Sequence, residues 1–286
     1  MQLNKRIAPI LMAVSMMLTS ISPVSASSPD LSEIPEYSGE AYTVLNDNVP
    51  DFSADDFTSN SFETYSDLDD LGRCGIAYAN IGQDLMPTEK RGNIGQVKPS
   101  GWHTIKYDNV DGKYLYNRCH LIGYQLTAEN ANEKNLITGT RYLNTEGMLP
   151  FENMVADYIK ETDNHVLYRV TPVFDGDNLV ASGVQMEAES VEDDGDGIQF
   201  NVFCYNIQPG ISIDYATGDS WLSDGSESGN AATETAEYIL NINSKKFHKP
   251  SCSSVSQMNE ANKQVYTGSR DDLIAQGYEA CKKCNP

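Results

Sequence analysis

The chain has 286 residues, with 41 Asp and Glu against 20 Lys and Arg, so its formal net charge at pH 7 is −21. Such an excess of acid excludes a protein that holds nucleic acid through a basic surface spread over the whole molecule, because that binding depends on Lys and Arg displacing counterions from phosphates. Residues 27–72 and 171–237 contain no Lys or Arg. Only residues 73–170 and 238–286 are therefore suited to facing a polyanion.

The N-terminus is typical of a secretory signal. Residues 1–26 begin with a basic pair, continue with an apolar run over 7–18 and end in Val24-Ser25-Ala26, which predicts cleavage after Ala26 and an exported protein. The apolar run is too short and too interrupted to be a good membrane span, so we expect no membrane span, and no obligate protein partner is evident. Residues 27–61 lack sustained periodicity, which predicts an acidic, disordered leader.

The next segment, residues 62–217, is predicted to form the main domain. Residues 71–82 and 112–126 have the apolar, Gly-punctuated texture of strands and turns. Apolar residues at helical spacing after Pro150 predict a helix over 150–161. Three strands are predicted to follow it, separated by turns rich in Asp and Gly, at 165–174, 178–186 and 197–207. The predicted fold class is α+β.

Residues 218–237 are rich in Ser, Gly, Thr and Ala and predict a flexible linker before a small domain at 238–286. That domain is too short for a sizeable apolar core and needs a bound metal ion or a disulfide to stay folded. His248, Cys252, Cys281 and Cys284 are four ligands that suit tetrahedral Zn²⁺. The alternative is a disulfide from Cys252 to Cys281 or Cys284, which export favours but which leaves one cysteine over.

A second group of residues indicates hydrolysis of phosphodiesters. Asn117-Arg118-Cys119-His120 ends an apolar-alternating strand, and Asn135, Asn144 and Glu152 follow at short range. The reaction needs a base for water, a cation for the developing charge and donors for the phosphate oxygens. Neutral imidazole favours His120 as the base, and the hard, neutral oxygen of an Asn amide favours Asn144 as a Mg²⁺ ligand.

At these residues the chain resembles the DNA/RNA non-specific endonucleases of the ββα-metal superfamily, in particular the streptodornase and DNA-entry types. The similarity spans about residues 71–205. The family signature Asp-Arg-Gly-His stands here as residues 117–120, and its Asn-x-Lys-Asn element as residues 132–135. Asn117 and Cys119 depart from that signature, and Cys119 adds a side chain where glycine allows close backbone approach.

The resemblance implies a ββα-metal nuclease domain with an antiparallel sheet and packed helices. It implies His120 as general base, Asn144 as direct Mg²⁺ ligand and Glu152 as the group that orients water at the metal. Asn135 would help to position the site, and Arg118 would support the loop or the phosphate. The implied protein is a secreted, Mg²⁺-dependent, sugar-nonspecific endonuclease that cuts DNA and also RNA.

Two further expectations are weaker. Arg141 lies three residues before Asn144 and is a candidate for bidentate phosphate binding, while a plain surface role stays open. The alternative to an enzyme is a non-catalytic nucleic-acid or surface-binding secreted protein that keeps a ββα remnant.

The tail resembles the metal-binding module of the Ada DNA-repair protein. Cys252, Cys281 and Cys284 match that module, and His248 stands where it has its methyl-accepting cysteine. A histidine there is able to bind zinc but cannot accept a methyl group as a thiolate does, so repair chemistry is not implied.

In the main domain, the odd set of Cys74, Cys119 and Cys204 leaves a disulfide between two of them open.

Overall fold

The computed structural model describes residues 29–223, 236–255, 258–268, 273–274 and 276–284. The predicted signal peptide and residues 224–235 of the predicted linker lie outside these described residues. Among the described residues, no helix combines the length and the apolar character needed to cross a bilayer.

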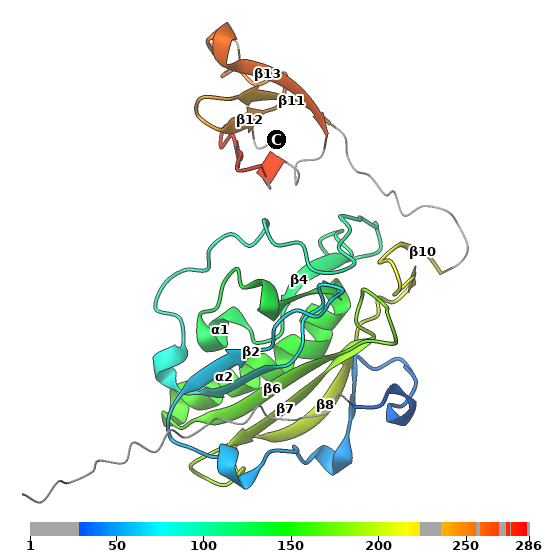
Figure 1. Ribbon diagram of the computed structural model, residues 1–286, viewed down its shortest axis with the longest axis vertical. Helices are drawn as coiled ribbons and strands as arrows, with labels where there is room; N and C mark the ends of the chain where they lie inside the picture. Colours follow the sequence, from blue (N-terminus) through cyan, green and yellow to red (C-terminus); the bar gives the residue numbers. More distant parts are fainter. Residues whose placement is uncertain (1–28, 224–235, 256–257, 269–272, 275, 285–286) are drawn as a thin grey trace, which may run out of the picture.

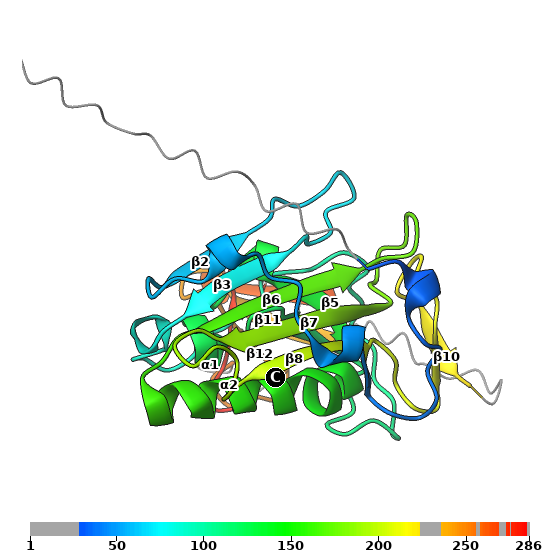
Figure 2. The same ribbon diagram turned by 90° about the horizontal axis from the view of Figure 1, so that it is seen from below.

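The main domain is built on a six-stranded antiparallel sheet with the strand order β1-β8-β7-β6-β3-β2 (Figure 1). Helix α2 runs along one face of this sheet, and the main apolar core lies between them (Figure 2). The α+β class is confirmed. The six strands are β1 Tyr42–Val44, β2 Phe62–Tyr65, β3 Ala77–Ile81, β6 Val166–Val173, β7 Gly183–Ser190 and β8 Gln199–Tyr205.

Two further strand pairs and several short helices complete the main domain. The paired strands are β4 Tyr116–His120 with β5 Leu136–Thr140, and β9 Ile211–Ile213 with β10 Ser220–Leu222. The longer helical elements are α1 Tyr124–Thr127, the π-helical turn η6 Leu143–Met148 and α2 Leu149–Thr162. The 3₁₀ turns are η1 Leu31–Glu33, η2 Asn46–Asn48, η3 Ala54–Asp56, η4 Gln83–Leu85 and η5 Glu133–Asn135.

Helix α2 agrees with the helix predicted at 150–161. Phe151, Val155 and Ile159 lie on one face and are buried against the sheet, as their spacing requires. The helix ends at Thr162 and is capped by Asp163, which has a left-handed backbone (φ 60°) and donates its N–H to the Ile159 carbonyl. At its other end α2 continues directly from η6, so residues of both elements reach the same edge of the domain.

The strands after α2 are found, but the second was misplaced. It was predicted at 178–186, and β7 instead spans Gly183–Ser190. The Val180 N–H donates to the Tyr215 carbonyl, and the Ser182 N–H donates to the Val173 carbonyl, so the chain up to Ser182 belongs to a loop. β7 itself begins at Gly183, the first residue that pairs with β6.

The leader predicted to be disordered is folded from residue 29 onward. Strand β1 pairs with β8 and covers that edge of the sheet. Further along, Arg169 and Glu187 form a buried ion pair of 2.7 Å; Arg169 donates to the Asp51 carbonyl, and Glu187 accepts from the Asp51 N–H. These contacts use main chain and a buried charge pair, which leave no apolar periodicity in the sequence. Similarly, β10 shows that the first linker residues are part of the fold.

The C-terminal unit has a four-stranded sheet in the order β13-β11-β12-β14, drawn in orange and red in Figure 1. Its elements are β11 Ala236–Asn241, β12 Lys246–His248, η7 Glu260–Asn262, β13 Lys263–Gly268 and β14 Glu279–Ala280. A small core of Tyr238, Leu240, Phe247, Leu273 and Tyr278 fills it. So few apolar residues make a weak core on their own.

Candidate active site

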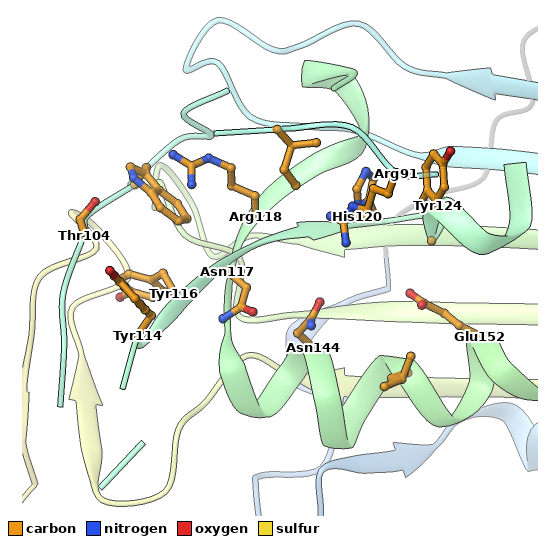
Figure 3. Close-up of a pocket in the computed structure, with 14 residues that line it drawn as sticks. Arg91, Thr104, Tyr114, Tyr116, Asn117, Arg118, His120, Tyr124, Asn144 and Glu152 are labelled. Atoms are coloured by element: carbon orange, nitrogen blue, oxygen red, sulfur yellow. Dashed lines mark hydrogen bonds between the residues drawn. The ribbon is translucent and has the colours of Figure 1, made fainter. Parts of the chain in front are cut away.

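A cavity of about 520 Å³ brings four of the predicted site residues together: Arg118, His120, Asn144 and Glu152. They come from β4, from the π-helical turn η6 and from the first turn of α2. Figure 3 shows Asn144 and Glu152 projecting from the helix side towards the strand that carries His120, with Arg91 beside the imidazole. Tyr114, Tyr116 and Thr104 lie at the other end of the cavity.

The hydrogen bonds of His120 fix its tautomer. Its Nε2 lies 2.7 Å from the Asn130 carbonyl oxygen, which only accepts, so Nε2 carries the proton. Its Nδ1 lies 3.2 Å from Nη2 of Arg91, which only donates, so Nδ1 carries the lone pair. The nitrogen that is able to accept a proton is therefore Nδ1.

The surroundings of His120 favour its neutral form. Burial lowers the pKa of His120, the hydrogen bond to the Asn130 carbonyl raises it and the positive charge of Arg91 lowers it, and the net pKa is about 4. The side chain is only 6% exposed. The imidazole therefore stays an unprotonated acceptor throughout the neutral pH range.

This low pKa predicts an acid-sensitive contribution to stability. An unfolded histidine titrates near pH 6.5, so below that pH the unfolded state binds a proton that the folded state refuses until about pH 4. The stabilisation is complete above pH 6.5 and is lost as the pH falls. Urea unfolding at pH 7.5 and 4.5 should show wild type losing roughly 2–3 kcal/mol more than His120→Gln. Equal losses in the two proteins would contradict the lowered pKa.

Asn144 and Glu152 supply oxygen ligands on the helix side of the cavity. Leu143, Gly147 and Met148 of η6 are buried in the core, and Asn144 from the same turn lines the cavity instead. Single π-helical turns of this kind are frequent at functional sites.

The Glu152 carboxylate packs closely against the backbone at Gly123. A Cβ at position 123 would lie 2.6 Å from Glu152 Oε2, so a side chain there would displace the carboxylate. Burial raises the pKa of Glu152 to about 7, and the charge of Arg91 and a hydrogen bond from Gln125 oppose that rise. An amide oxygen and a carboxylate in one cavity form a donor set that fits a hard cation such as Mg²⁺.

Arg118 and Asn135 hold the cavity walls. Arg118 donates to the Val97 carbonyl and, at 2.9 Å, to the Gly95 carbonyl, while its guanidinium lies 4.0 Å from the centre of the Trp102 ring. Asn135 is fully buried and does not line the cavity; it bonds both the N–H and the carbonyl of Ile122. Both residues therefore hold neighbouring backbone segments in place.

Arg141 lies outside the set of residues that line the cavity and pairs with Asp111 at 2.9 Å on the surface. Sequence reasoning missed Arg91, whose guanidinium reaches the imidazole from a different loop. Arg91 belongs to no motif and stands 29 residues before His120. The one available signal was the place of Arg91 within residues 73–170, one of the two segments suited to facing a polyanion.

Cys119, next to His120, faces the core. Its Sγ donates to the Asn144 Oδ1 at 3.3 Å, and its side chain is fully buried. Burial raises the pKa of Cys119 well above the usual value for a thiol, so it keeps its proton. All six cysteines are free, and the disulfides left open by the sequence are not formed.

The tail brings its four predicted ligands together. The ligand atoms of His248, Cys252, Cys281 and Cys284 all lie within 4.8 Å of one another. His248 Nδ1 is buried without a hydrogen-bond partner, as expected of a nitrogen reserved for a metal ion. A hydrogen bond from the Ser254 backbone is the largest of the causes that lower the pKa of Cys252 to about 6, which favours the thiolate that binds zinc.

Comparison with known proteins shows that residues 54–192 match the family described as DNA/RNA non-specific endonuclease. Among solved structures, the chain is similar to NucA from Streptococcus agalactiae with a magnesium ion bound (27% identity, TM-score 0.56, 63% of this chain and 86% of that one). The metal-free form of the same nuclease is also similar (26% identity, TM-score 0.58, 68% and 92%).

A third similar structure is the Sda1 nuclease with a bound zinc ion (27% identity, TM-score 0.53, 64% of this chain and 97% of that one). The similarity extends over nearly the whole length of these nucleases and about two thirds of this chain.

Proposed function

We propose that the protein is an exported, Mg²⁺-dependent endonuclease. It cuts DNA and RNA internally without regard to sequence. The match of residues 54–192 to the DNA/RNA non-specific endonuclease family and the similar solved nucleases support a nucleic-acid hydrolase. The observation that carries the proposal is one cavity lined by His120, whose Nδ1 is an acceptor, and by the oxygen-bearing side chains of Asn144 and Glu152. The proposed groups act on the phosphate backbone of the nucleic acid and not on its bases, so we expect little sequence preference.

In the proposed reaction His120 Nδ1 takes the proton of the attacking water. Asn144 would hold Mg²⁺ through its amide oxygen, and Glu152 would contribute its carboxylate to the same site. The positive charge of the ion would stabilise the transition state and the leaving oxygen. The Nε2–H bond to the Asn130 carbonyl holds the ring in place and stabilises the imidazolium that forms.

Arg91 is proposed to bind the scissile phosphate. Its exposed side chain donates to the same Nδ1 that must accept the proton, so the two contacts exclude each other. A phosphate oxygen is a stronger acceptor for a guanidinium than a neutral imidazole, because the hydrogen bond is then charge-assisted on both sides. Substrate binding thus draws Arg91 away and frees the base.

For the tail we propose a structural Zn²⁺ held by His248, Cys252, Cys281 and Cys284. Three thiols and one imidazole form a closed tetrahedral set with no position left for substrate. The orphaned Nδ1 of His248 and the close approach of the four ligand atoms support this assignment.

The proposed function is tested with supercoiled plasmid and with single-stranded RNA. We expect the purified full chain to nick and linearise the plasmid and to degrade the RNA in Mg²⁺, and EDTA to stop both reactions. A protein that binds the plasmid in Mg²⁺ or Mn²⁺ without cutting it would instead support the non-catalytic alternative. Intact RNA beside cut DNA would restrict the substrate to DNA.

A further inference from the structure

The residue before the catalytic histidine contacts the proposed metal ligand. The thiol of Cys119 donates to the side-chain oxygen of Asn144, at 3.3 Å. The two residues come from β4 and η6 and are 25 positions apart in sequence. Family signatures have glycine at this position, as noted above, so the contact is a feature of this chain and not of the common motif.

The opposing strand makes room for this side chain. Gly139 lies on β5, and a Cβ there would overlap the sulfur of Cys119 and come within 2.9 Å of its Cβ. The space that a side chain at 139 would fill is thus occupied from across the hairpin by Cys119. Packing against Gly139 fixes the position of the thiol, from which it donates to Asn144.

We propose that Cys119 is a positioning residue that orients the side-chain amide of Asn144 for metal binding. This inference rests on the proposed role of Asn144 as a Mg²⁺ ligand. An Asn amide presents an oxygen at one end and an NH₂ group at the other, and a half-turn about its terminal torsion exchanges them. A thiol donor favours the orientation in which the oxygen faces it. The second lone pair of that oxygen remains for the cation.

The chain offers a matched control for the loss of a buried thiol. Cys204 is also fully buried in the same apolar core, and its Sγ donates to the sulfur of Met186 instead of to a site residue. Changing either cysteine to alanine removes one sulfur from the core and should lower the melting temperature. Only the change at Cys119 removes the donor to Asn144.

The test is direct binding of Mn²⁺ to the zinc-loaded full chain, followed by the electron paramagnetic resonance signal of the free ion. Mn²⁺ takes the same oxygen ligands as Mg²⁺. Since S–H···O bonds are weak, we expect Cys119→Ala to raise the Kd about two- to five-fold. Cys204→Ala should leave the Kd unchanged, and Cys119→Ser, which keeps a donor, should bind close to wild type.

Equal Kd values for wild type and Cys119→Ala would overturn the inference while leaving the proposed function intact. So would an equal weakening by Cys204→Ala, since that would point to general loosening of the core, or a folded Cys119→Ser variant as weak as Cys119→Ala. A wild-type chain that binds no Mn²⁺ would overturn both the inference and the proposed cofactor. Melting temperatures measured without added Mn²⁺ separate folding from binding in each case.

Discussion

Replacing His120 with alanine should reduce plasmid cutting by about a hundred- to ten-thousand-fold, the usual contribution of a general base. Nδ1 of His120 is the only proposed proton acceptor, and the variant leaves no group in its place. The Mg²⁺ ligands are untouched, so binding of metal and of DNA should persist. Initial rates of plasmid nicking, with DNA affinity measured separately in Ca²⁺, check this expectation.

Folding of the variant must be verified independently, because the buried ring of His120 also bonds the Asn130 carbonyl. Circular dichroism and a urea melt serve this purpose. His120→Gln is the better-matched variant, since its amide retains hydrogen-bonding capacity where alanine has none. Cutting within about tenfold of wild type by either folded variant would rule out His120 as the base.

Removing zinc from the tail should unfold the C-terminal unit and leave the main domain folded. In zinc-dependent modules the binding free energy, about 10–16 kcal/mol, is the folding free energy, and the small core here has little to replace it. Elemental analysis should give one zinc per wild-type chain. Cys281→Ser should lose the zinc and become sensitive to protease within residues 236–284.

Cys74→Ser is the control for Cys281→Ser. Cys74 is a buried free thiol of the main domain that donates to backbone carbonyls, a role that a hydroxyl can take over. This variant should keep its zinc and its resistance to protease. A wild-type chain without zinc, with Cys252 joined to Cys281 or Cys284 in a disulfide, would refute the metal assignment.

How much of the site the sequence predicts depends on the range of the interactions. His120, Asn144 and Glu152 were predicted from a motif that fixes their spacing, and β4, η6 and α2 bring them to one cavity. Helix α2 was found because its buried face repeats with helical period. Arg91 was missed because its contact with His120 is made by one loop side chain, and no local pattern records such a contact.

The errors in the fold have the same origin. β7 was misplaced because its start is set by hydrogen bonds from Val180 to the Tyr215 carbonyl and from Ser182 to the Val173 carbonyl, and not by its own alternation. The leader was predicted to be disordered because its contacts with the main domain are backbone pairing with β8 and hydrogen bonds to the buried pair of Arg169 and Glu187. Such contacts leave no periodic pattern in the sequence. Both depend on partners more than a hundred residues away or on turn geometry, which composition does not encode.

The folded leader has a practical consequence for anyone who expresses this protein. Because β1 occupies the outer edge of β8, a recombinant chain trimmed to the family match at residue 54 would present a bare strand, ready to pair with its neighbours. The carboxylate of Glu187 would also lose the hydrogen bond that it accepts from the Asp51 N–H. Poor solubility of such a fragment would thus reflect the cut and not the enzyme.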